Sequence, residues 1–174
     1  MDGLTPVNQG LLSLGLPSQT PCTPMGIMKL IQSTQRNPEG LIAAVIGRSP
    51  LVGSPVSKLL THANATVLTI HSRSSQPEKL CKQADIVIAA AGVHKLAGSD
   101  WIKPGAVVID VGIHRDASGK LAGDVDFDTV SPLASHITPV PGGVGPMTIA
   151  CLLANCIKAY EWRQTGDHPY VTYT

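Results

Sequence analysis

Aromatic side chains are scarce in this sequence of 174 residues: they make up 3% of it and include a single Phe. A core with so few rings must be built from Val, Ile, Leu and Ala, the residues that fill parallel sheets covered by helices. Charged residues are also few, at 14%, and the net charge is only +1, which argues against a nucleic-acid partner, because such surfaces are strongly basic. No apolar run approaches the roughly 18 residues of a membrane-spanning helix, so we expect no membrane partner.

Cysteine pairs with metal or redox spacing are missing as well. None of the four cysteines forms a Cys-x-x-Cys pair, so we expect buried thiols and no metal. The first residues, MDGLTP, lack the basic and apolar regions of a signal peptide. These features are typical of a cytoplasmic protein, although an organelle protein whose leader has been removed would share them.

Hydrophobic residues make up 43% of the chain, enough for a buried core, and they occur in short runs that alternate between strand and helix patterns. This alternation predicts an α/β fold: a doubly wound, mostly parallel sheet of Rossmann type with helices on both faces. Strands are expected at 41–46, 65–71, 85–91, 106–111 and 137–140. Helices are expected at 24–35, 51–62, 76–83, 126–134 and 146–162.

The first candidate ligand site is the turn at residues 47–53, with the sequence GRSPLVG. It lies between the first predicted strand and its helix, where a Rossmann-type domain binds the pyrophosphate of a dinucleotide through backbone N–H groups. The spacing Gly-x-Ser-x-x-x-Gly matches only half of the general Gly-x-Gly-x-x-Gly fingerprint. Ser49 replaces the middle glycine, which narrows the approach and adds a hydroxyl donor. The turn alone also fits a strand–helix connection that binds no ligand.

Polar residues follow the second predicted strand, in the sequence HSRSS at 71–75. An NAD-specific site places an acidic residue here to accept bonds from the ribose hydroxyls. The next acid is Glu78, whereas Ser72, Arg73 and Arg48 supply hydroxyls and positive charge. A planar guanidinium suits the oxygens of a 2′-phosphate, so the residues favour NADP over NAD. A solvated polar loop is the alternative.

Two further segments are placed to meet a ligand. The run at 139–148, PVPGGVGPMT, leads into the last predicted helix. Its glycines let the backbone approach a ligand closely, and its prolines restrict the direction of the chain. It suits contact with a flat ligand, or it is only a tight connector. Val-Gly-Ile at 111–113 ends the fourth predicted strand, at the edge where ligands of this fold bind. We expect surface or capping roles for His62, His94, His136 and His168.

Together these segments resemble the bifunctional methylenetetrahydrofolate dehydrogenase/cyclohydrolase family over about residues 2–162. The run at 138–148, TPVPGGVGPMT, looks like the signature of that family. Three other segments are similar in order and spacing: PCTPMG at 21–26, VIGRSPLVGSP at 45–55 and WIKPGAVVIDVGI at 101–113.

The resemblance implies oxidation of 5,10-methylenetetrahydrofolate by NADP and hydrolysis of the methenyl product to 10-formyltetrahydrofolate. Such a homodimeric enzyme would serve one-carbon metabolism and purine biosynthesis. Asp2 matches the family's aspartate that hydrogen-bonds the pterin ring. Gly47, Arg48, Ser49, Ser72 and Ile113 would contact NADP, with Arg48 and Ser72 at the 2′-phosphate and Arg73 beside them. The folate cleft would be lined by Pro141, Gly142, Gly143, Val144, Gly145, Pro146, Met147, Thr148 and Ile149.

The Tyr-x-x-x-Lys motif of the family's N-terminal domain, with its catalytic lysine, does not occur in these 174 residues. We therefore expect the chain to begin where that domain ends, as a truncation, a short gene product or half of a split gene. The expected division is a linker and helix left from an upstream domain at 1–35, an NADP-binding domain at 36–145, a long helix at 146–163 and a disordered tail at 164–174.

Two alternative functions remain open from the sequence. A non-catalytic NADP-binding module that needs a partner chain with the lysine is favoured by the missing motif. Another NADP dehydrogenase of this fold, such as a shikimate-type enzyme, is disfavoured by the run at 139–148.

Overall fold

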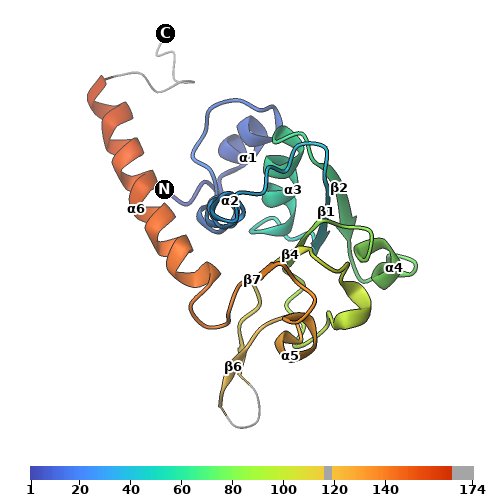
Figure 1. The fold of residues 1–174 in the computed structure, drawn as a ribbon. Coiled ribbons are helices and arrows are strands. Elements are labelled where there is room, and N and C mark those ends of the chain that lie inside the picture. The colour runs from blue at the N-terminus through green and yellow to red at the C-terminus, as the bar shows by residue number, and fades with distance from the viewer. Residues whose placement is uncertain (116–118, 166–174) are drawn as a thin grey trace.

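A five-stranded parallel sheet is the centre of the computed structural model, which describes residues 1–115 and 119–165 (Figure 1). The strand order is β2-β1-β3-β4-β7, and each neighbouring pair is parallel. The chain steps outward from β1 to β2 and then continues through β3 on the other side of β1, so the sheet is doubly wound and the predicted α/β fold is confirmed. The strands are β1 (Ile42–Ile46), β2 (Thr66–Ile70), β3 (Ile86–Ala89), β4 (Val107–Asp110) and β7 (His136–Ile137).

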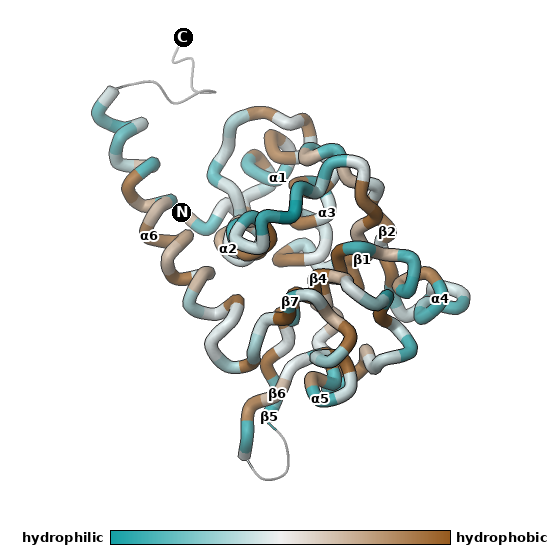
Figure 2. Tube along the Cα trace, in the orientation of Figure 1, coloured by the Kyte–Doolittle hydropathy of each residue, from teal (hydrophilic) through white to brown (hydrophobic). Residues whose placement is uncertain are grey.

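Helices cover both faces of this sheet, as predicted. Side chains alternate between the two faces of a strand, so Ala43 and Val45 of β1 join one core cluster and Ala44 and Ile46 join the other. The first cluster packs against α2 (Cys22–Ser33) and α3 (Gly53–His62). The second packs against α4 (Pro77–Cys81), the 3-10 turn η1 (Ser99–Trp101) and α5 (Phe127–Val130). Figure 2 shows the hydrophobic residues of the central strands between these layers.

The N-terminal segment is more regular than expected. Residues 1–35 were expected to be a linker and one helix, but a further helix, α1 (Pro6–Ser13), lies before α2. Thr5 caps the helix by accepting a bond from the Asn8 N–H at 3.3 Å, and Pro6 stands in the first turn, where its missing N–H costs nothing. Gly10 lies within this helix and does not break it, because the helix is capped and its Leu12 is buried.

Several predicted boundaries shift by a few residues. Helix α2 begins at Cys22 rather than at 24, and α3 begins at Gly53 rather than at 51. Helix α6 (Val144–Thr165) is longer at both ends than the predicted 146–162, so residues 164 and 165 are helical rather than part of a tail. The remainder of the predicted tail, 166–174, lies outside the described residues.

A short hairpin that had not been predicted as strands follows β4. Strands β5 (His114–Arg115) and β6 (Leu121–Ala122) pair antiparallel. Residues 116–118, between these two strands in the sequence, lie outside the described residues. Within residues 1–115 and 119–165, no helix combines the length and apolar character needed to cross a membrane.

Candidate functional site

Two cavities open at the carboxyl edge of the sheet, where ligands of doubly wound folds bind. The Arg48 cavity, about 380 Å³, lies beyond the ends of β1 and β2. The Pro141 cavity, about 450 Å³, lies beyond the end of β4 and beside the start of α6. The sheet changes winding direction between β1 and β3, so a ligand that filled both cavities would cross the switch point of the fold.

The Arg48 cavity has a positive rim and an apolar floor. Of the predicted cofactor residues, Gly47, Arg48 and Ser72 line it, whereas Ser49 and Arg73 do not. No acidic side chain is among its described lining residues, so an anionic group meets no repulsion there. The remaining lining residues are Ile46, Ile70, His71, Pro77, Ala91, Val93, Leu96 and Trp101.

The turn at the entrance of the Arg48 cavity is shaped by two glycines. Gly47 has a φ of +124°, and a side chain there would collide with the carbonyl oxygen of Ala90. A side chain on Gly53 would collide in turn with the backbone of Gly47. Ser49 takes up an unexpected role, because its Oγ accepts bonds from the N–H groups of Val52 at 3.2 Å and Gly53 at 3.5 Å. Its hydroxyl proton stays available to a ligand, since a hydroxyl both accepts and donates.

Arg73 is placed by its backbone rather than by its side chain. Its N–H donates to His71 Nδ1 at 3.2 Å, and the His71 N–H donates to Ser74 Oγ at 3.0 Å. These bonds close the turn after β2 and direct Ser72 to the cavity. Arg48 is therefore the one arginine among the described residues that line this cavity.

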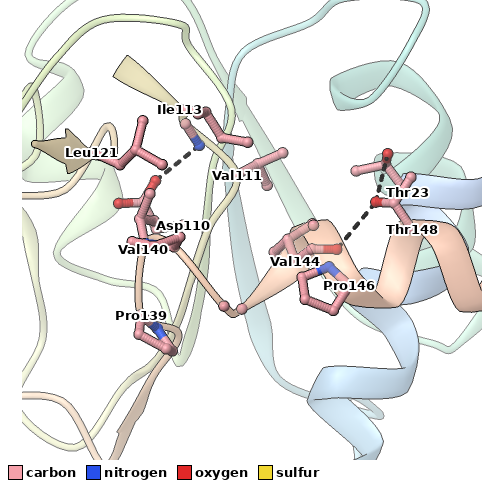
Figure 3. A pocket seen from close by; sticks show the side chains of 15 residues that line it. Thr23, Asp110, Val111, Ile113, Leu121, Pro139, Val140, Val144, Pro146 and Thr148 are labelled. Atoms are coloured by element: carbon pink, nitrogen blue, oxygen red, sulfur yellow. Dashed lines mark hydrogen bonds between the residues drawn. The ribbon is translucent and has the colours of Figure 1, made fainter. Parts of the chain in front are cut away.

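The Pro141 cavity gathers segments that are far apart in the sequence. Residues 139–146 and Thr148 form one wall, Thr23 of α2 contributes a hydroxyl, and residues 110–113 close the opposite side together with Leu121. Thr23 and Thr148 point toward each other, with their hydroxyl oxygens 3.0 Å apart (Figure 3). Ile113, predicted as a cofactor residue, is 66% exposed on this cavity.

Most of the predicted folate-cleft residues line this cavity, and two do not. Met147 packs instead against α2, where a side chain on Gly26 would come within 3.1 Å of its Cβ. Ile149 is 64% exposed and lies outside the lining. The residues of the predicted set that line the cavity are Pro141, Gly142, Gly143, Val144, Gly145, Pro146 and Thr148.

Asp2 lies next to the Pro141 cavity but not in its lining. Its Oδ1 accepts a bond from the Cys22 N–H at 3.1 Å, which satisfies a free amide at the start of α2. The preceding carbonyl, of Met1, accepts from Asn155 Nδ2 of α6 at 3.0 Å. These two bonds tie the first residues of the chain to both α2 and α6.

Two buried aspartates between the cavities escaped the sequence analysis. Asp110, at the end of β4, accepts bonds from the N–H groups of Gly112, Asp124 and Val125 at 2.9–3.0 Å. Asp124 Oδ2 accepts from the N–H groups of Ala91 at 2.6 Å and Gly92 at 2.8 Å, and its Oδ1 lies 2.7 Å from His114 Nε2. For Asp110, the sequence did contain a signal: an acidic residue at the end of a buried strand needs backbone N–H donors to compensate its burial.

Burial alters the titration of several groups around the site. Burial raises the pKa of Asp110 above its usual value, and the nearby Asp124 adds to this, while the N–H groups of Val125, Asp124 and Gly112 oppose it. Burial, with the adjacent Asp2, also raises the pKa of the Cys22 thiol to about 12. Burial alone raises the pKa of Cys81 to about 12, so both thiols are neutral and poor nucleophiles.

Comparison with known proteins agrees with the resemblance seen in the sequence. Residues 21–164 match the family model described as tetrahydrofolate dehydrogenase/cyclohydrolase, NAD(P)-binding domain. The bifunctional protein FolD of Listeria monocytogenes is 56% identical over 159 residues, which cover 91% of this chain and 56% of that protein. The chain thus spans about half the length of the curated relatives it matches.

Solved structures with the same fold point to the same family. The bifunctional FolD enzyme of Campylobacter jejuni superposes with a TM-score of 0.91 at 49% identity, over 93% of this chain and 58% of the other. The FolD of Trypanosoma brucei, solved with NADP cofactor and inhibitor, superposes with a TM-score of 0.86 at 39% identity, over 92% and 57%. This chain therefore belongs to the tetrahydrofolate dehydrogenase/cyclohydrolase family and carries the NAD(P)-binding domain of that family.

Proposed function

We propose that this chain binds NADP across the Arg48 and Pro141 cavities. The observation that carries the proposal is the Arg48 cavity at the ends of β1 and β2: it is cationic, has no acid among its described lining residues, and lies beside a glycine turn with no room for side chains at Gly47 and Gly53. A guanidinium and a hydroxyl at this place suit the 2′-phosphate that distinguishes NADP from NAD. The FolD of Trypanosoma brucei, solved with NADP, supports the choice.

Within this proposal the residues have separate tasks. Gly47 lets the pyrophosphate approach the backbone, and Ser49 holds the start of α3 while it offers its proton. Arg48 and Ser72 bind the 2′-phosphate, with Arg73 as a second, outer charge. Ile113 packs against the nicotinamide half in the Pro141 cavity.

We further propose that the chain supplies the nucleotide-binding part of an enzyme acting on 5,10-methylenetetrahydrofolate. NADP, when bound, accepts the electrons of that oxidation, and the methenyl product is hydrolysed to 10-formyltetrahydrofolate. Residues 141–146 and Thr148 would form one wall of the folate cleft, with Asp2 beside it to orient the pterin ring. By the family resemblance, the catalytic lysine would lie in the part of the relatives that these 174 residues do not match. In this role the chain would serve one-carbon metabolism and purine biosynthesis in the cytoplasm, where its four free thiols are stable.

The cofactor proposal is tested by titration calorimetry of the purified chain with NADP and with NAD. We expect saturable binding of NADP and weaker binding of NAD. Equal affinities would refute the role assigned to the Arg48 cavity.

A second candidate is a NADP-binding module that works only with a partner chain, and the surface of α6 favours it. The outer side of this helix exposes apolar residues at the spacing of one helical stripe. An apolar stripe of this kind marks an association surface, either for a chain like the part of the relatives that these residues do not match or for a second copy in a homodimer. The stripe consists of Ile149, Leu152, Leu153, Ile157 and Tyr160.

Association is tested by light scattering of the chain alone and mixed with the N-terminal part of a FolD relative. The module proposal predicts a complex with that part and a weaker complex for Leu153→Asp. A chain that stays monomeric in both samples would contradict it.

A further inference from the structure

Asp124 is in contact with the walls of both cavities. Its Oδ2 accepts bonds from the N–H groups of Ala91 and Gly92, and Ala91 lines the Arg48 cavity. Its Oδ1 lies 2.7 Å from Nε2 of His114. His114 directly follows Ile113, and Ile113 lines the Pro141 cavity. In the tautomer that carries the proton on Nε2, the His114 ring donates to Asp124 Oδ1.

Close packing fixes where the two carboxylates lie. A side chain on Gly112 would collide with Asp124, and a side chain on Gly123 would collide with Asp110. Asp124 is 1% exposed and Asp110 4% exposed, so neither can swing into solvent. The fold therefore fixes the position of Asp124, and the groups that hydrogen-bond to its carboxylate are held in place by it.

We propose that the His114–Asp124 contact is a positioning device that holds the Ile113 segment at the distance from the Arg48 cavity that a bound dinucleotide requires. The inference rests on the proposed binding of NADP across both cavities. The adenosine half would occupy the Arg48 cavity, and the nicotinamide half would pass the end of β3 to reach Ile113. The Asp124 carboxylate then connects the wall of the Arg48 cavity with the wall of the Pro141 cavity.

The two aspartates divide this work. Asp110 binds the backbone of residues 112, 124 and 125, so it holds the loop as a structural unit. His114 is the side chain through which Asp124 reaches the hairpin that follows Ile113, and its side chain is 22% exposed. Replacing His114 leaves the bonds of Asp110 and the bonds of Asp124 to Ala91 and Gly92 in place, so the expected effect is local.

The experiment uses two substitutions and two ligands. His114→Phe keeps a ring of similar size but removes the donor, and His114→Gln keeps a donor that can reach Asp124. His62→Phe, in an exposed histidine at the end of α3, is the matched control. The probes are NADP, which spans both cavities, and adenosine 2′,5′-bisphosphate, which fits the Arg48 cavity alone. Binding is measured by titration calorimetry, and amide hydrogen exchange of residues 112–115 is measured without ligand.

We expect His114→Phe to weaken NADP about tenfold, the loss of one good hydrogen bond, and to change adenosine 2′,5′-bisphosphate by less than about twofold. His114→Gln should restore most of the NADP affinity, and residues 112–115 should exchange faster in His114→Phe only. Equal weakening of both ligands, or of neither, would overturn the inference.

Failure of the cofactor proposal would look different. In that case the wild-type chain binds neither NADP nor adenosine 2′,5′-bisphosphate. The exchange rates then decide the remaining question, because unchanged exchange of residues 112–115 in His114→Phe would show that His114 does not hold this segment.

Discussion

Gly143 lies against Pro139 so closely that a Cβ on Gly143 would come within 2.6 Å of the Pro139 carbonyl oxygen and 2.8 Å of Thr138 Cβ. The family resemblance had implied that Gly143 lines the folate cleft. The positive φ in this run belongs to Gly142 instead, at +103°. Gly143 is required because the loop packs on itself.

This packing predicts different effects on stability for two glycine substitutions in the same loop. Gly143→Val should lower the free energy of unfolding by about 1–3 kcal/mol, the usual cost of an overpacked site, and should weaken ligand binding with it. Gly145→Val should leave stability within about 0.5 kcal/mol, because a Cβ there meets no atom within 4 Å, yet it should narrow the Pro141 cavity that Gly145 lines. Thermal unfolding and titration with a tetrahydrofolate analogue would measure both effects. A Gly143→Val protein of normal stability would contradict the packing argument.

Arg48 should carry the preference for NADP. A charge-assisted hydrogen bond contributes about 1.5–3 kcal/mol, so Arg48→Ala should weaken NADP about ten- to a hundredfold and leave NAD nearly unchanged. Arg73→Ala removes the same charge from the residue after Ser72, outside the cavity lining, so the loss of NADP affinity should be smaller. Titration calorimetry with both cofactors measures the difference. Equal losses of NADP and NAD in Arg48→Ala would exclude a role at the 2′-phosphate.

Asp85 should contribute to the acid dependence of stability. Its Oδ1 accepts a bond from Lys103 Nζ at 2.6 Å and its Oδ2 from the Ile42 N–H at 3.1 Å. The Lys103 ammonium, followed by the Ile42 N–H, holds the pKa of Asp85 below its usual 3.8 against the opposing effect of burial. A lowered pKa in the folded state adds stability above the unfolded value, and this gain is lost as the pH falls below 3.8 toward the folded value.

Asp85→Asn should therefore be less stable than the wild type at about pH 7, and the two proteins should converge at about pH 2. Urea unfolding at a series of pH values provides the measurement. Asp128→Asn, which removes the same charge from an exposed position in α5, is the control. If the difference in free energy of unfolding between Asp85→Asn and the wild type stayed constant across this range, ionisation of Asp85 would not contribute to stability.

The isolated chain should be a poor enzyme. Positioning of two reactants can lower a barrier by about 7–11 kcal/mol, and the chain supplies only one wall of the proposed folate cleft. The assay follows formation of the methenyl product by its near-ultraviolet absorbance, with the full-length FolD of Listeria monocytogenes as the positive control. Turnover near 10 per second, that of an ordinary enzyme, would mean that the catalytic groups lie within these 174 residues.

The main elements could be predicted from the sequence because their signals are local. Aliphatic runs of strand length, separated by helix-period segments, are sufficient to indicate a parallel sheet with covered faces. The turn at 47–53 and the run at 139–148 are likewise contiguous, so their composition alone marked them. Helix α1 was missed although Thr5 and Pro6 form a helix-start signal, a hydroxyl at the N-cap followed by a proline in the first turn.

The sequence by itself determined which residues could meet a dinucleotide; the tertiary structure decided which of them lie together. Arg48 and Arg73 are equivalent in composition, but the turn after β2 leaves only Arg48 in the cavity lining. Asp110, His114 and Asp124 form one cluster because the hairpin after β4 folds back on the strand end. Hydrogen bonds and close packing between distant segments depend on distances that a linear pattern does not contain, so these contacts became visible only when the sheet had brought the loops to one edge.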